Sequence, residues 1–395
     1  IVCYFVLYML NTNCMNNPAA EISSYLKHGD YSVAVRRTLD LCLDSGNDVL
    51  IEKAIGWSRQ YHAIEHGEAG KALPAVFSEE AEIILQEASA TGAGSVEQHK
   101  HLISAENISK KYNNGSFSLK PINLSVDTGD VLGVVGENGN GKTTLLRCLA
   151  GQLGLNNGVI RYHLLENPDA YAIKNHIAFI PQRIPKWYGM LKDNLHFSAA
   201  IAGINGDKNN LMVDFMLERL NLSSYAHLTW DQISSGYRTR FEIARILLQK
   251  PRLLILDEPL ANLDINAQQT ILTDLIFMAK GVHNPMGIIL SSQQLHEVEK
   301  VADSVIFIKQ GNCIYKSSDA EGKITSNAVE FETKAERESI IRLFGEGNIE
   351  LQFNGGFYTI ISATLSSQEI IGKLIDAKIP VTYFRDITYS TKRFF

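Results

Sequence analysis

Apolar positions in the first quarter of the chain recur three and four residues apart. This spacing is typical of amphipathic helices that bury one face, and it extends from residue 19 to about residue 90. The apolar runs are separated by residues that commonly begin or end helices, so we predict four helices. The predicted boundaries are a start at Asn17-Pro18, stops at Gly29 and Gly46, N-caps at Asp30 and Asp48, and a fourth start at Ser78.

A small, polar segment from Thr91 to His101 is typical of a linker, and the pattern changes beyond it. From residue 102 to about residue 323, short apolar runs alternate with helical segments. Continuous apolar runs of this length suit strands that are buried on both faces, so we expect an α/β domain with a mostly parallel sheet. The predicted strands are 131–135, 177–180, 253–256, 287–291 and 304–308.

The last part of the chain repeats an α/β alternation on a smaller scale. We predict strands at 328–332, 357–362 and 381–384 and helices at 335–344 and 367–377. The length of 395 residues suits two or three domains. The expected division is a helical extension with its linker at 15–100, a central domain at 101–323 and a small α/β domain at 324–395.

The first residues are apolar but too few to span a membrane. The chain begins with Ile1, and the run to Leu10 is half of the ~20 residues that a spanning helix needs. It lacks the basic start and the cleavage site of a signal peptide. We therefore interpret 1–14 as translated sequence upstream of a start at Met15, or as disordered. No other segment of the sequence has spanning length, so we expect another chain to supply any membrane spans.

The composition is that of a globular protein, with 45% hydrophobic and 20% charged residues. The formal net charge of −6 provides no global basic field, so nucleic acid is not an expected partner. His62, His66, His99 and His101 lack the spacing of metal ligands. The five cysteines are scattered and indicate neither a disulfide framework nor a zinc site.

A phosphate-binding motif follows the first predicted buried strand. The segment from Gly136 to Thr143, GENGNGKT, matches the P-loop pattern G-x-x-x-x-G-K-[ST] and leads into a predicted helix at 144–149. Its glycines allow backbone N–H groups to turn around phosphate oxygens, and the helix N-terminus adds positive potential. Lys142 is expected to reach the β and γ phosphates, and the Thr143 hydroxyl to ligate Mg²⁺. The alternative, a glycine-rich turn with a chance lysine, does not explain the strand and helix around it.

The complement to this motif is a buried strand that ends in two carboxylates. Four apolar residues at 253–256 deliver Asp257 to the end of the strand, where it can hold Mg²⁺ through water. Glu258 follows and is placed to polarise a water toward the γ phosphate. Many strands end in acidic turns, so the signal gains its weight from the P-loop.

With these motifs the chain resembles the nucleotide-binding subunits of ATP-binding-cassette (ABC) transporters, from about Ile103 to Lys323. The segment Ile233-Ser-Ser-Gly-Tyr237 and the helix after it look like the family signature L-S-G-G-Q, and it lies before Asp257 as in the family. The resemblance implies a pair of subunits arranged head to tail. Ser234 and the Gly236 N–H would then act on the ATP held by the other P-loop.

Other family elements occur in the expected order, and their roles are implied by the resemblance alone. Gln182 matches the Q-loop glutamine that reaches Mg²⁺ or water, and Asp264 matches the D-loop aspartate at the dimer interface. Tyr112 matches the aromatic residue that stacks on adenine, although a tyrosine at a strand end is often a packing residue. The implied P-loop contacts to ATP come from Gly136, Asn138, Gly139, Asn140, Gly141, Lys142, Thr143 and Thr144.

Two motifs depart from the family pattern. In the signature, Ser235 replaces a glycine and Tyr237 replaces the glutamine. In the switch region, Gln293 stands where the family has a histidine. Glutamine can donate a hydrogen bond to the γ phosphate, but it cannot carry a proton or a positive charge. We therefore expect Gln293 to slow hydrolysis while ATP binding is retained, and His296, three residues on, is not expected to substitute.

The resemblance implies a P-loop NTPase cassette with a helical lobe between Gln182 and Ser234, and a Mg²⁺-dependent ATPase that powers transport. The segment from Met190 to Leu195 is similar to the one before the helical lobe of exporters, so the expected direction is export. The implied partners are transmembrane permease subunits and a second copy or a paralogous ATPase, on the cytoplasmic face of a membrane. Two alternatives stay open: a soluble ABC ATPase that acts on nucleic acid or ribosomes, and an ATP-dependent clamp with slow turnover.

Overall fold

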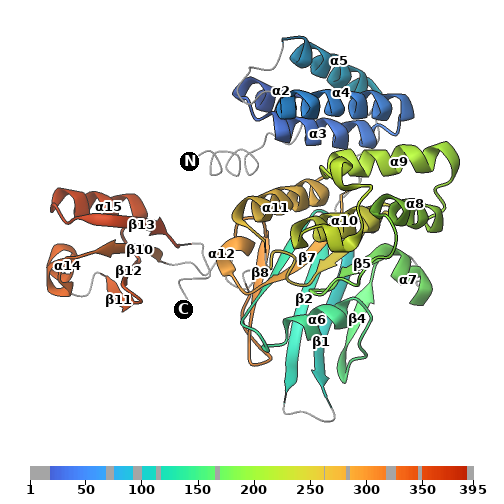
Figure 1. Cartoon of the computed structure of the whole chain (residues 1–395). Coiled ribbons are helices and arrows are strands. Elements are labelled where there is room, and N and C mark those ends of the chain that lie inside the picture. The colour runs from blue at the N-terminus through green and yellow to red at the C-terminus, as the bar shows by residue number, and fades with distance from the viewer. Residues whose placement is uncertain are drawn as a thin grey trace.

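The computed structural model describes residues 18–67, 75–91, 100–112, 117–164, 170–261, 263–281, 285–316, 326–345 and 349–388. Three regions follow one another along the chain (Figure 1). The expected upstream segment 1–14 and most of the expected linker lie outside the described residues. None of the helices in the described ranges is long and apolar enough to cross a membrane.

The first region consists of four helices, here called the N-terminal helices: α2 (Pro18–His28), α3 (Tyr31–Asp44), α4 (Asp48–Gly67) and α5 (Ala75–Thr91). Their apolar faces meet in a shared core, as the periodicity predicted. The Trp57 ring stacks on Phe77 with centroids 4.4 Å apart, and its indole N–H donates to the Phe77 carbonyl oxygen at 3.0 Å. This contact ties α4 to α5.

Of the predicted helix starts, the N-cap at Asp30 is confirmed in position, and those at Asp48 and Ser78 are wrong by one and three residues. Asp30 occupies the N-cap of α3, but only its backbone carbonyl accepts hydrogen bonds, from the N–H groups of residues 33 and 34. Asp48 is the first residue of α4, and Asn47 caps it by accepting from Val49 N–H at 3.0 Å. Helix α5 begins at residue 75, upstream of Ser78, because buried Phe77 belongs to its core-facing side.

The second region, residues 101–316, is called the cassette. Its main sheet has the order β5-β6-β7-β3-β8-β9, in which only β9 runs antiparallel. All five predicted strands are present, two of them one residue longer than expected, and the predicted parallel sheet is confirmed. The strands are β3 (Val131–Val135), β5 (Ile177–Ile180), β6 (Leu253–Leu256), β7 (Gly287–Ser292), β8 (Ser304–Lys309) and β9 (Asn312–Lys316).

A second, antiparallel sheet in the cassette was not predicted. Its order is β2-β1-β4, from β1 (His101–Lys111), β2 (Ser118–Asp127) and β4 (Asn157–Tyr162). In β2, buried and exposed residues alternate, so this strand lacks the continuous apolar run that marked the parallel strands. Its buried face packs with β3 and with α6 (Lys142–Leu149) in one hydrophobic cluster.

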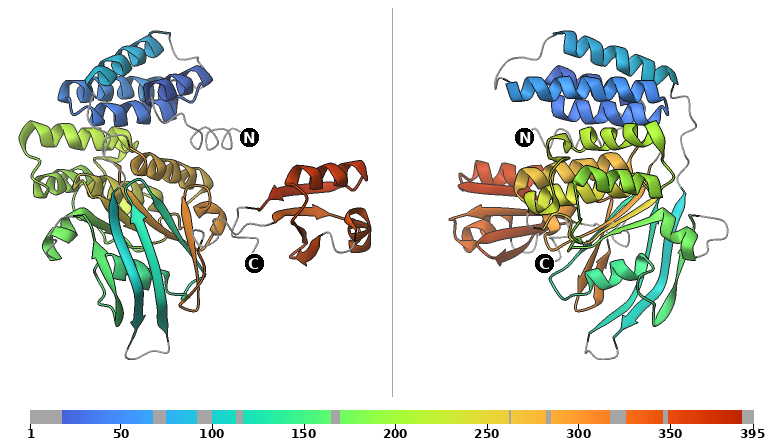
Figure 2. Two further views of the ribbon diagram at one scale, coloured as in Figure 1. Left: turned by 180° about the vertical axis from the view of Figure 1, so that it is seen from behind. Right: turned by 45° about the vertical axis from the view of Figure 1, so that its right-hand side comes forward.

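Helices cover the main sheet and form the predicted helical lobe. The lobe contains α8 (Leu191–Ile201) and α9 (Gly206–Arg219), with the short turns η2 (Ser223–Tyr225) and η3 (Trp230–Gln232) after them. The N-terminal helices lie against this lobe, with α4 along α9, in all three ribbon views (Figure 2). The remaining cassette helices are α7 (Ala170–His176), α10 (Ser235–Leu247), α11 (Ile265–Ala279) and α12 (Leu295–Val298).

The third region, called the C-terminal unit, has its own sheet and its own core. Its elements follow the order β-α-β-β-α-β, and the sheet order β11-β12-β10-β13 is that of a ferredoxin-like fold. The predicted α/β alternation is confirmed, but strand β11 was not predicted. The elements are β10 (Asn327–Thr333), α14 (Arg337–Phe344), β11 (Glu350–Asn354), β12 (Phe357–Ser362), α15 (Ser367–Asp376) and β13 (Val381–Asp386).

Candidate nucleotide-binding site

The P-loop connects β3 to α6, and two glycines fix its path, one by close approach to backbone and one by a left-handed φ. Gly141 has φ of 103°, and a Cβ atom there would lie 2.5 Å from Cζ of Phe117. A Cβ atom at Gly136 would lie 2.3 Å from the carbonyl oxygen of Ile308. The backbone oxygen at Gly136 and the left-handed φ at Gly141 both favour glycine over a residue with a side chain. The loop opens onto the N-terminus of α6, which begins at Lys142, two residues before the predicted start.

Asn140 anchors the P-loop to the turn that follows β8, the strand next to β3 in the main sheet. Its side-chain oxygen accepts from the Gln310 N–H at 2.9 Å, and its carbonyl oxygen accepts from the Gly311 N–H at 3.1 Å. Both donors belong to the turn between β8 and β9. The resemblance implied a contact of Asn140 with ATP, whereas its buried side chain here is used to hold the loop in place.

Lys142 points into the protein and not into solvent. Its Nζ donates to the carbonyl oxygens of Gly136 at 2.7 Å and Glu137 at 3.2 Å, and lies 2.9 Å from Oε1 of Glu258. The side chain is only 4% exposed. The lysine that is expected to bind phosphate is therefore satisfied by protein oxygens, including the candidate general base.

Glu258 is the centre of a side-chain network. Its Oε2 accepts from Gln293 Nε2 at 2.7 Å and from Gln182 Nε2 at 3.1 Å. Its backbone N–H donates to Ser291 Oγ at 2.9 Å. The residue has φ of 50°, in the left-handed region that a glutamate seldom adopts. Three residues predicted from separate motifs, Lys142, Gln182 and Gln293, thus converge on one carboxylate.

Asp257 is linked to the P-loop directly. Thr143 Oγ1 donates to Asp257 Oδ2 at 2.7 Å, and Ser291 Oγ donates to Asp257 Oδ1 at 2.8 Å. Asp257 is buried at the end of β6. The threonine and the aspartate predicted to share a Mg²⁺ ion are therefore in contact.

Ser291 holds both acidic residues, yet the sequence reasoning gave it no role. In the register of β6 and β7, Leu256 pairs with Leu290, so Ser291 comes level with Asp257. Ser291 could have been identified from the sequence if β6 and β7 had been predicted as neighbouring strands.

Tyr112 lies beside the P-loop helix, at the end of β1. Its hydroxyl is 3.3 Å from Thr144 Oγ1, and Lys110 Nζ lies 6.0 Å from the centre of its ring. The residue is 38% exposed, so part of it is accessible from solvent. This placement is compatible with either stacking on adenine or packing.

The signature residues form a separate group at the starts of α10 and α11. Ser234 is the N-cap of α10 but its side chain makes no capping bond. A Cβ atom at Gly236 would lie 3.3 Å from Leu263 Cδ2, so this part of α10 packs closely on the segment before α11. Asp264 caps α11 by accepting from Ala267 N–H at 2.9 Å. The hydrogen bonds around Glu258 do not include Ser234, Gly236 or Asp264.

The tyrosine that replaces the signature glutamine is held by another tyrosine. The Tyr237 and Tyr225 ring centroids lie 3.9 Å apart. Burial, followed by the hydrogen bond with Tyr225, raises the pKa of Tyr237 to about 12. The guanidinium group of Arg240 lies over the Tyr237 ring, 5.5 Å from its centroid. The substituted signature is thus supported by local packing.

Comparison with known proteins agrees with this geometry. Residues 119–261 match the ABC transporter family. The ABC transporter ATP-binding protein NatA of Bacillus subtilis is 30% identical over 210 residues, which cover 51% of this chain and 82% of NatA. The chain belongs to the ABC transporter ATP-binding proteins. A second relative of this family, the phosphonates import ATP-binding protein PhnC of Bdellovibrio bacteriovorus, is 32% identical and covers 56% and 89% of the two chains.

A solved ABC ATPase has the same fold. The structure of cbiO1 from Clostridium perfringens, part of the ABC transporter complex cbiONQ, matches with a TM-score of 0.50 and 26% identity, over 56% of this chain and 90% of cbiO1. The ABC cassette and the ATPase activity predicted from the motifs are thereby confirmed at the level of the family. The side chain of His296, which follows the switch position in α12, is outside the described atoms.

Proposed function

We propose that this chain hydrolyses ATP to power export, as one of a pair of ATPase subunits bound to separate transmembrane permease subunits. The observation that carries the proposal is the convergence of Lys142, Gln182 and Gln293 on Glu258, next to the contact between Asp257 and Thr143. These are the groups needed to bind a triphosphate and to activate a water molecule.

ATP binding would rearrange the contacts of Lys142. The β and γ phosphate oxygens compete with Glu258 for its ammonium group, and the P-loop N–H groups hold the remaining oxygens. Glu258, released from the lysine and still held by the two glutamines, can then accept the proton of the water that attacks the γ phosphorus. The bond to the leaving phosphate oxygen breaks, and ADP and phosphate are the products.

Mg²⁺ fits the donor set of this site. The Thr143 hydroxyl and the Asp257 carboxylate are hard oxygen donors in contact with each other, and the side-chain oxygen of Gln182 is a third candidate. Within the described ranges no group of three or more His, Cys, Asp or Glu could hold a metal ion. Reliance on few protein ligands, with phosphate and water oxygens, is typical of Mg²⁺, which neutralises phosphate charge when bound.

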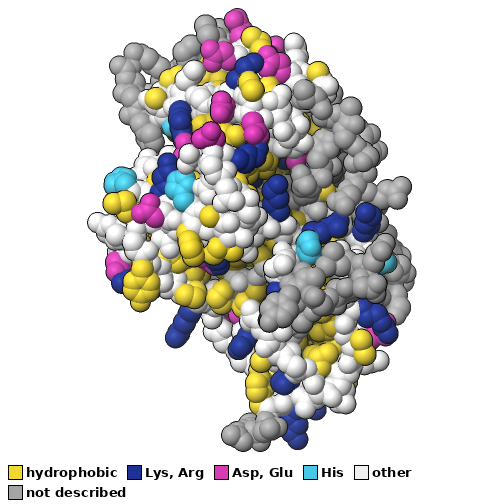
Figure 3. All heavy atoms as spheres, turned by 90° about the vertical axis from the view of Figure 1, so that its right-hand side faces the viewer, with side chains coloured by type: hydrophobic (Ala, Val, Ile, Leu, Met, Phe, Trp, Pro, Cys, Tyr) yellow, Lys and Arg dark blue, Asp and Glu magenta, His cyan; other side chains and the backbone are white. Residues whose placement is uncertain are grey.

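The surface of the helical lobe supports a permease partner. Tyr188, Met190, Phe197 and Ile201 are large apolar residues that stand exposed on α8 and the segment before it. Hydrophobic side chains are visible on the face that carries this lobe (Figure 3). Groups of exposed apolar side chains on a protein surface often mark sites of interaction with another protein or with a membrane. We assign the permease contact, and hence a place on the cytoplasmic face of a membrane, to this lobe.

The direction of transport is inferred from the segment between Met190 and Leu195 at the start of α8. PhnC of Bdellovibrio bacteriovorus is an import protein with a similar cassette, so the overall likeness of the cassette does not set the direction. In the paired arrangement, Ser234 and Gly236 would cap the ATP of the other subunit, Asp264 would lie at the interface, and Tyr112 would stack on adenine. The division at residues 100 and 323 would leave the two flanking regions outside this catalytic pair.

The catalytic part is tested with Glu258→Gln in the full chain. We expect ATP binding to persist and turnover to fall by about 10²–10⁴, the usual contribution of a general base. Lys142→Ala is the matched control, because it should lose ATP binding as well. Turnover at the wild-type rate in Glu258→Gln would refute the assignment.

Export is tested by isolation of the chain from its own membranes. Co-purification with a multi-spanning protein, followed by ATP-driven movement of solute out of sealed cells, supports the proposal. Sedimentation with ribosomes would instead support the nucleic-acid alternative.

A slow ATP-dependent clamp is the second candidate, favoured by the 2.7 Å hydrogen bond from Gln293 to Glu258. A glutamine in this position holds the carboxylate without the ability to transfer charge. Gln293→His should raise turnover in the partner-bound complex, and Gln293→Ala should lower it. Unchanged turnover in Gln293→His would show that Gln293 does not limit hydrolysis.

A further inference from the structure

Ser291, near the end of β7, joins the two acidic residues of the candidate site. The residue is fully buried, so bulk water is excluded from its hydrogen bonds. Its Oγ donates to Asp257 Oδ1 at 2.8 Å, and the same oxygen accepts from the Glu258 N–H at 2.9 Å. A hydroxyl has a single proton, so donation to Asp257 leaves the oxygen lone pairs to receive the Glu258 N–H. The direction of both hydrogen bonds is therefore fixed.

The Ser291 hydroxyl takes the place of a backbone partner where the pairing of the strands ends. Backbone pairing between β6 and β7 stops one residue before Asp257. The Asp257 N–H donates to the carbonyl oxygen of Ile180, in β5, at 2.9 Å. The next N–H, that of Glu258, is received by the Ser291 side chain from β7. The left-handed φ of 50° at Glu258 persists only where the surroundings hold it, and this hydrogen bond is one of the contacts that do so.

The neighbouring serine has a different set of contacts. Ser292 Oγ donates to Glu297 Oε2 at 2.8 Å and accepts from the Gln294 N–H at 3.0 Å. Successive side chains of a strand point to opposite faces. The two hydroxyls therefore serve different segments, Ser291 the end of β6 and Ser292 the start of α12.

We infer that Ser291 is a positioning residue for ATP hydrolysis, which holds the Mg²⁺ ligand and the general base in one arrangement. The inference rests on the roles that the proposed function gives to Asp257 and Glu258. The hydrogen bond to Asp257 Oδ1 orients this carboxylate so that its other oxygen meets Thr143, the second residue that would hold Mg²⁺. The hydrogen bond from the Glu258 N–H holds the backbone turn from which the general base reaches Gln293.

Ser291→Ala in the full chain removes both hydrogen bonds with a small change in volume. We expect kcat to fall about tenfold, because the Glu258 N–H loses its buried acceptor and Asp257 loses a donor. The KM for ATP should change little, since the P-loop is unaltered. Steady-state hydrolysis measured against ATP concentration separates the two constants.

The second readout is nucleotide binding without turnover. The non-hydrolysable ATP analogue AMPPNP is titrated calorimetrically into the full chain, once with Mg²⁺ and once with EDTA. In Ser291→Ala we expect about tenfold weaker binding in Mg²⁺, because Asp257 is less well oriented toward the metal. Binding in EDTA should have the wild-type affinity, since it depends on the P-loop alone.

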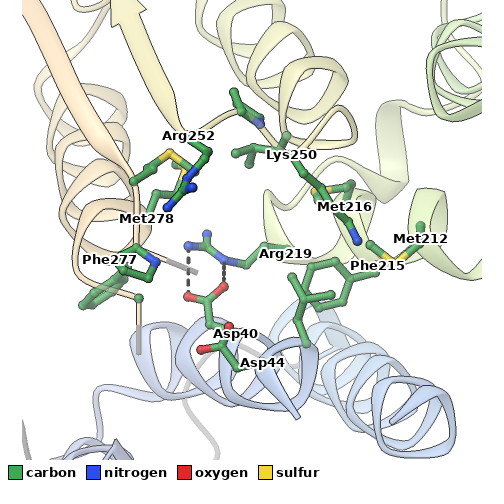
Figure 4. A pocket seen from close by; sticks show the side chains of 16 residues that line it. Asp40, Asp44, Met212, Phe215, Met216, Arg219, Lys250, Arg252, Phe277 and Met278 are labelled. Carbon is green, nitrogen blue, oxygen red and sulfur yellow. Dashed lines mark hydrogen bonds and ion pairs between the residues drawn. The ribbon is translucent and has the colours of Figure 1, made fainter. Parts of the chain in front are cut away.

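Ser58→Ala is the matched control, because it also removes a fully buried serine hydroxyl that donates to a carboxylate. Ser58 Oγ donates to Glu218 Oε2 at 3.2 Å, between α4 and α9. The pair of Arg219 and Asp40 still joins α9 to α3 in this variant (Figure 4). We expect Ser58→Ala to lose stability in denaturant unfolding to a similar extent, with wild-type kcat. A fall in kcat equal to that of Ser291→Ala would assign the effect to stability and overturn the inference.

Ser291→Thr keeps a hydroxyl on a residue that suits a strand, so it should retain more of kcat than Ser291→Ala does. If the alanine variant does not fold, Ser291→Cys replaces it, because a thiol occupies a similar space and is a weak donor. A threonine variant as slow as the alanine variant contradicts the inference. Wild-type kcat and wild-type binding in Mg²⁺ for Ser291→Ala, or for its cysteine replacement, overturn it as well. Wild-type turnover in Glu258→Gln refutes the proposed function itself, so the two failures are distinguishable.

Discussion

The two regions that flank the cassette are attached to it in different ways. Buried residues of the N-terminal helices belong to the same hydrophobic cluster as those of the helical lobe and the main sheet. The C-terminal unit has a cluster of its own, and it reaches the cassette through an ion pair of 3.3 Å between Arg385 and Glu299. We infer that the N-terminal helices fold and unfold with the cassette, whereas the C-terminal unit can unfold separately.

Ion pairs also connect the N-terminal helices to the cassette more extensively than they connect the C-terminal unit to it. The buried Arg219 joins α9 to Asp40 of α3 and to Asp274 of α11, and Arg36 of α3 donates to the same Asp274 at 2.9 Å. The N-terminal helices therefore contact both the helical lobe and a helix on the main sheet. A region held across two lobes of an ATPase is placed to respond to their relative movement.

The largest expected effect comes from Arg219→Met. This change leaves Asp40 and Asp274 without their buried partner, so we expect a loss of about 3–5 kcal/mol in the free energy of unfolding. Denaturant unfolding should show the cassette and the N-terminal helices destabilised together. The matched control is Arg161→Met, which breaks the exposed pair with Glu106 and should cost about 1 kcal/mol or less. Equal losses in the two variants would contradict the shared core.

Ile360→Ala tests the independence of the C-terminal unit. Ile360 is fully buried in that unit's core, so a loss of about 2–5 kcal/mol is expected. Calorimetry should show a separate transition at lower temperature, with the cassette transition unmoved. A single shifted transition would show that the unit is coupled to the cassette after all.

Acid should weaken the N-terminal attachment by a smaller amount. Burial alone would raise the pKa of Asp214, but its bonds to Lys192 at 2.9 Å and Arg59 at 3.0 Å outweigh this and lower it below the ordinary 3.8. The ionised carboxylate contributes its full stabilisation above the ordinary pKa of 3.8, which applies to the unfolded chain. This stabilisation is lost as the pH falls through the lower pKa of the folded protein. We expect a loss of at most about 1 kcal/mol below pH ~4, absent in Asp214→Asn, in unfolding measured against pH.

Arg385→Gln has the smallest expected effect on stability, about 0–1 kcal/mol, because the pair with Glu299 is partly exposed. The main effect of this change should be on the position of the C-terminal unit relative to the cassette. Small-angle scattering should report a wider range of arrangements for the C-terminal unit, with both unfolding transitions kept. A scattering curve identical to the wild type would mean that other contacts hold the unit.

The sequence predicted those parts of the fold and site that depend on short segments. The apolar runs identified every parallel strand, and the P-loop and the Asp257-Glu258 pair identified the catalytic edge of the sheet. Strands β1, β2 and β4 were missed because one of their faces is polar and no continuous apolar run marks them.

The remaining features depend on contacts between distant parts of the chain. Arg219 and Asp40 are 179 positions apart, and Asn140 and Gln310 are 170 apart. Neither pair has a local signal, because each exists only after the helices and the sheet are packed. The same holds for Ser291, whose role follows from the order of β6 and β7 and not from its neighbours in sequence.

The backbone conformation of Glu258 lowers the stability of the fold at the candidate site. A left-handed conformation costs about 1–2 kcal/mol for a residue with a Cβ atom, and whole domains are stable by only about 5–15 kcal/mol. Glycine would meet the backbone requirement at position 258 without strain, but it has no carboxylate. A glutamate at position 258 therefore lowers the stability of the fold and supplies the carboxylate of the candidate site. Natural proteins depart from local structural preferences in this way at functional sites.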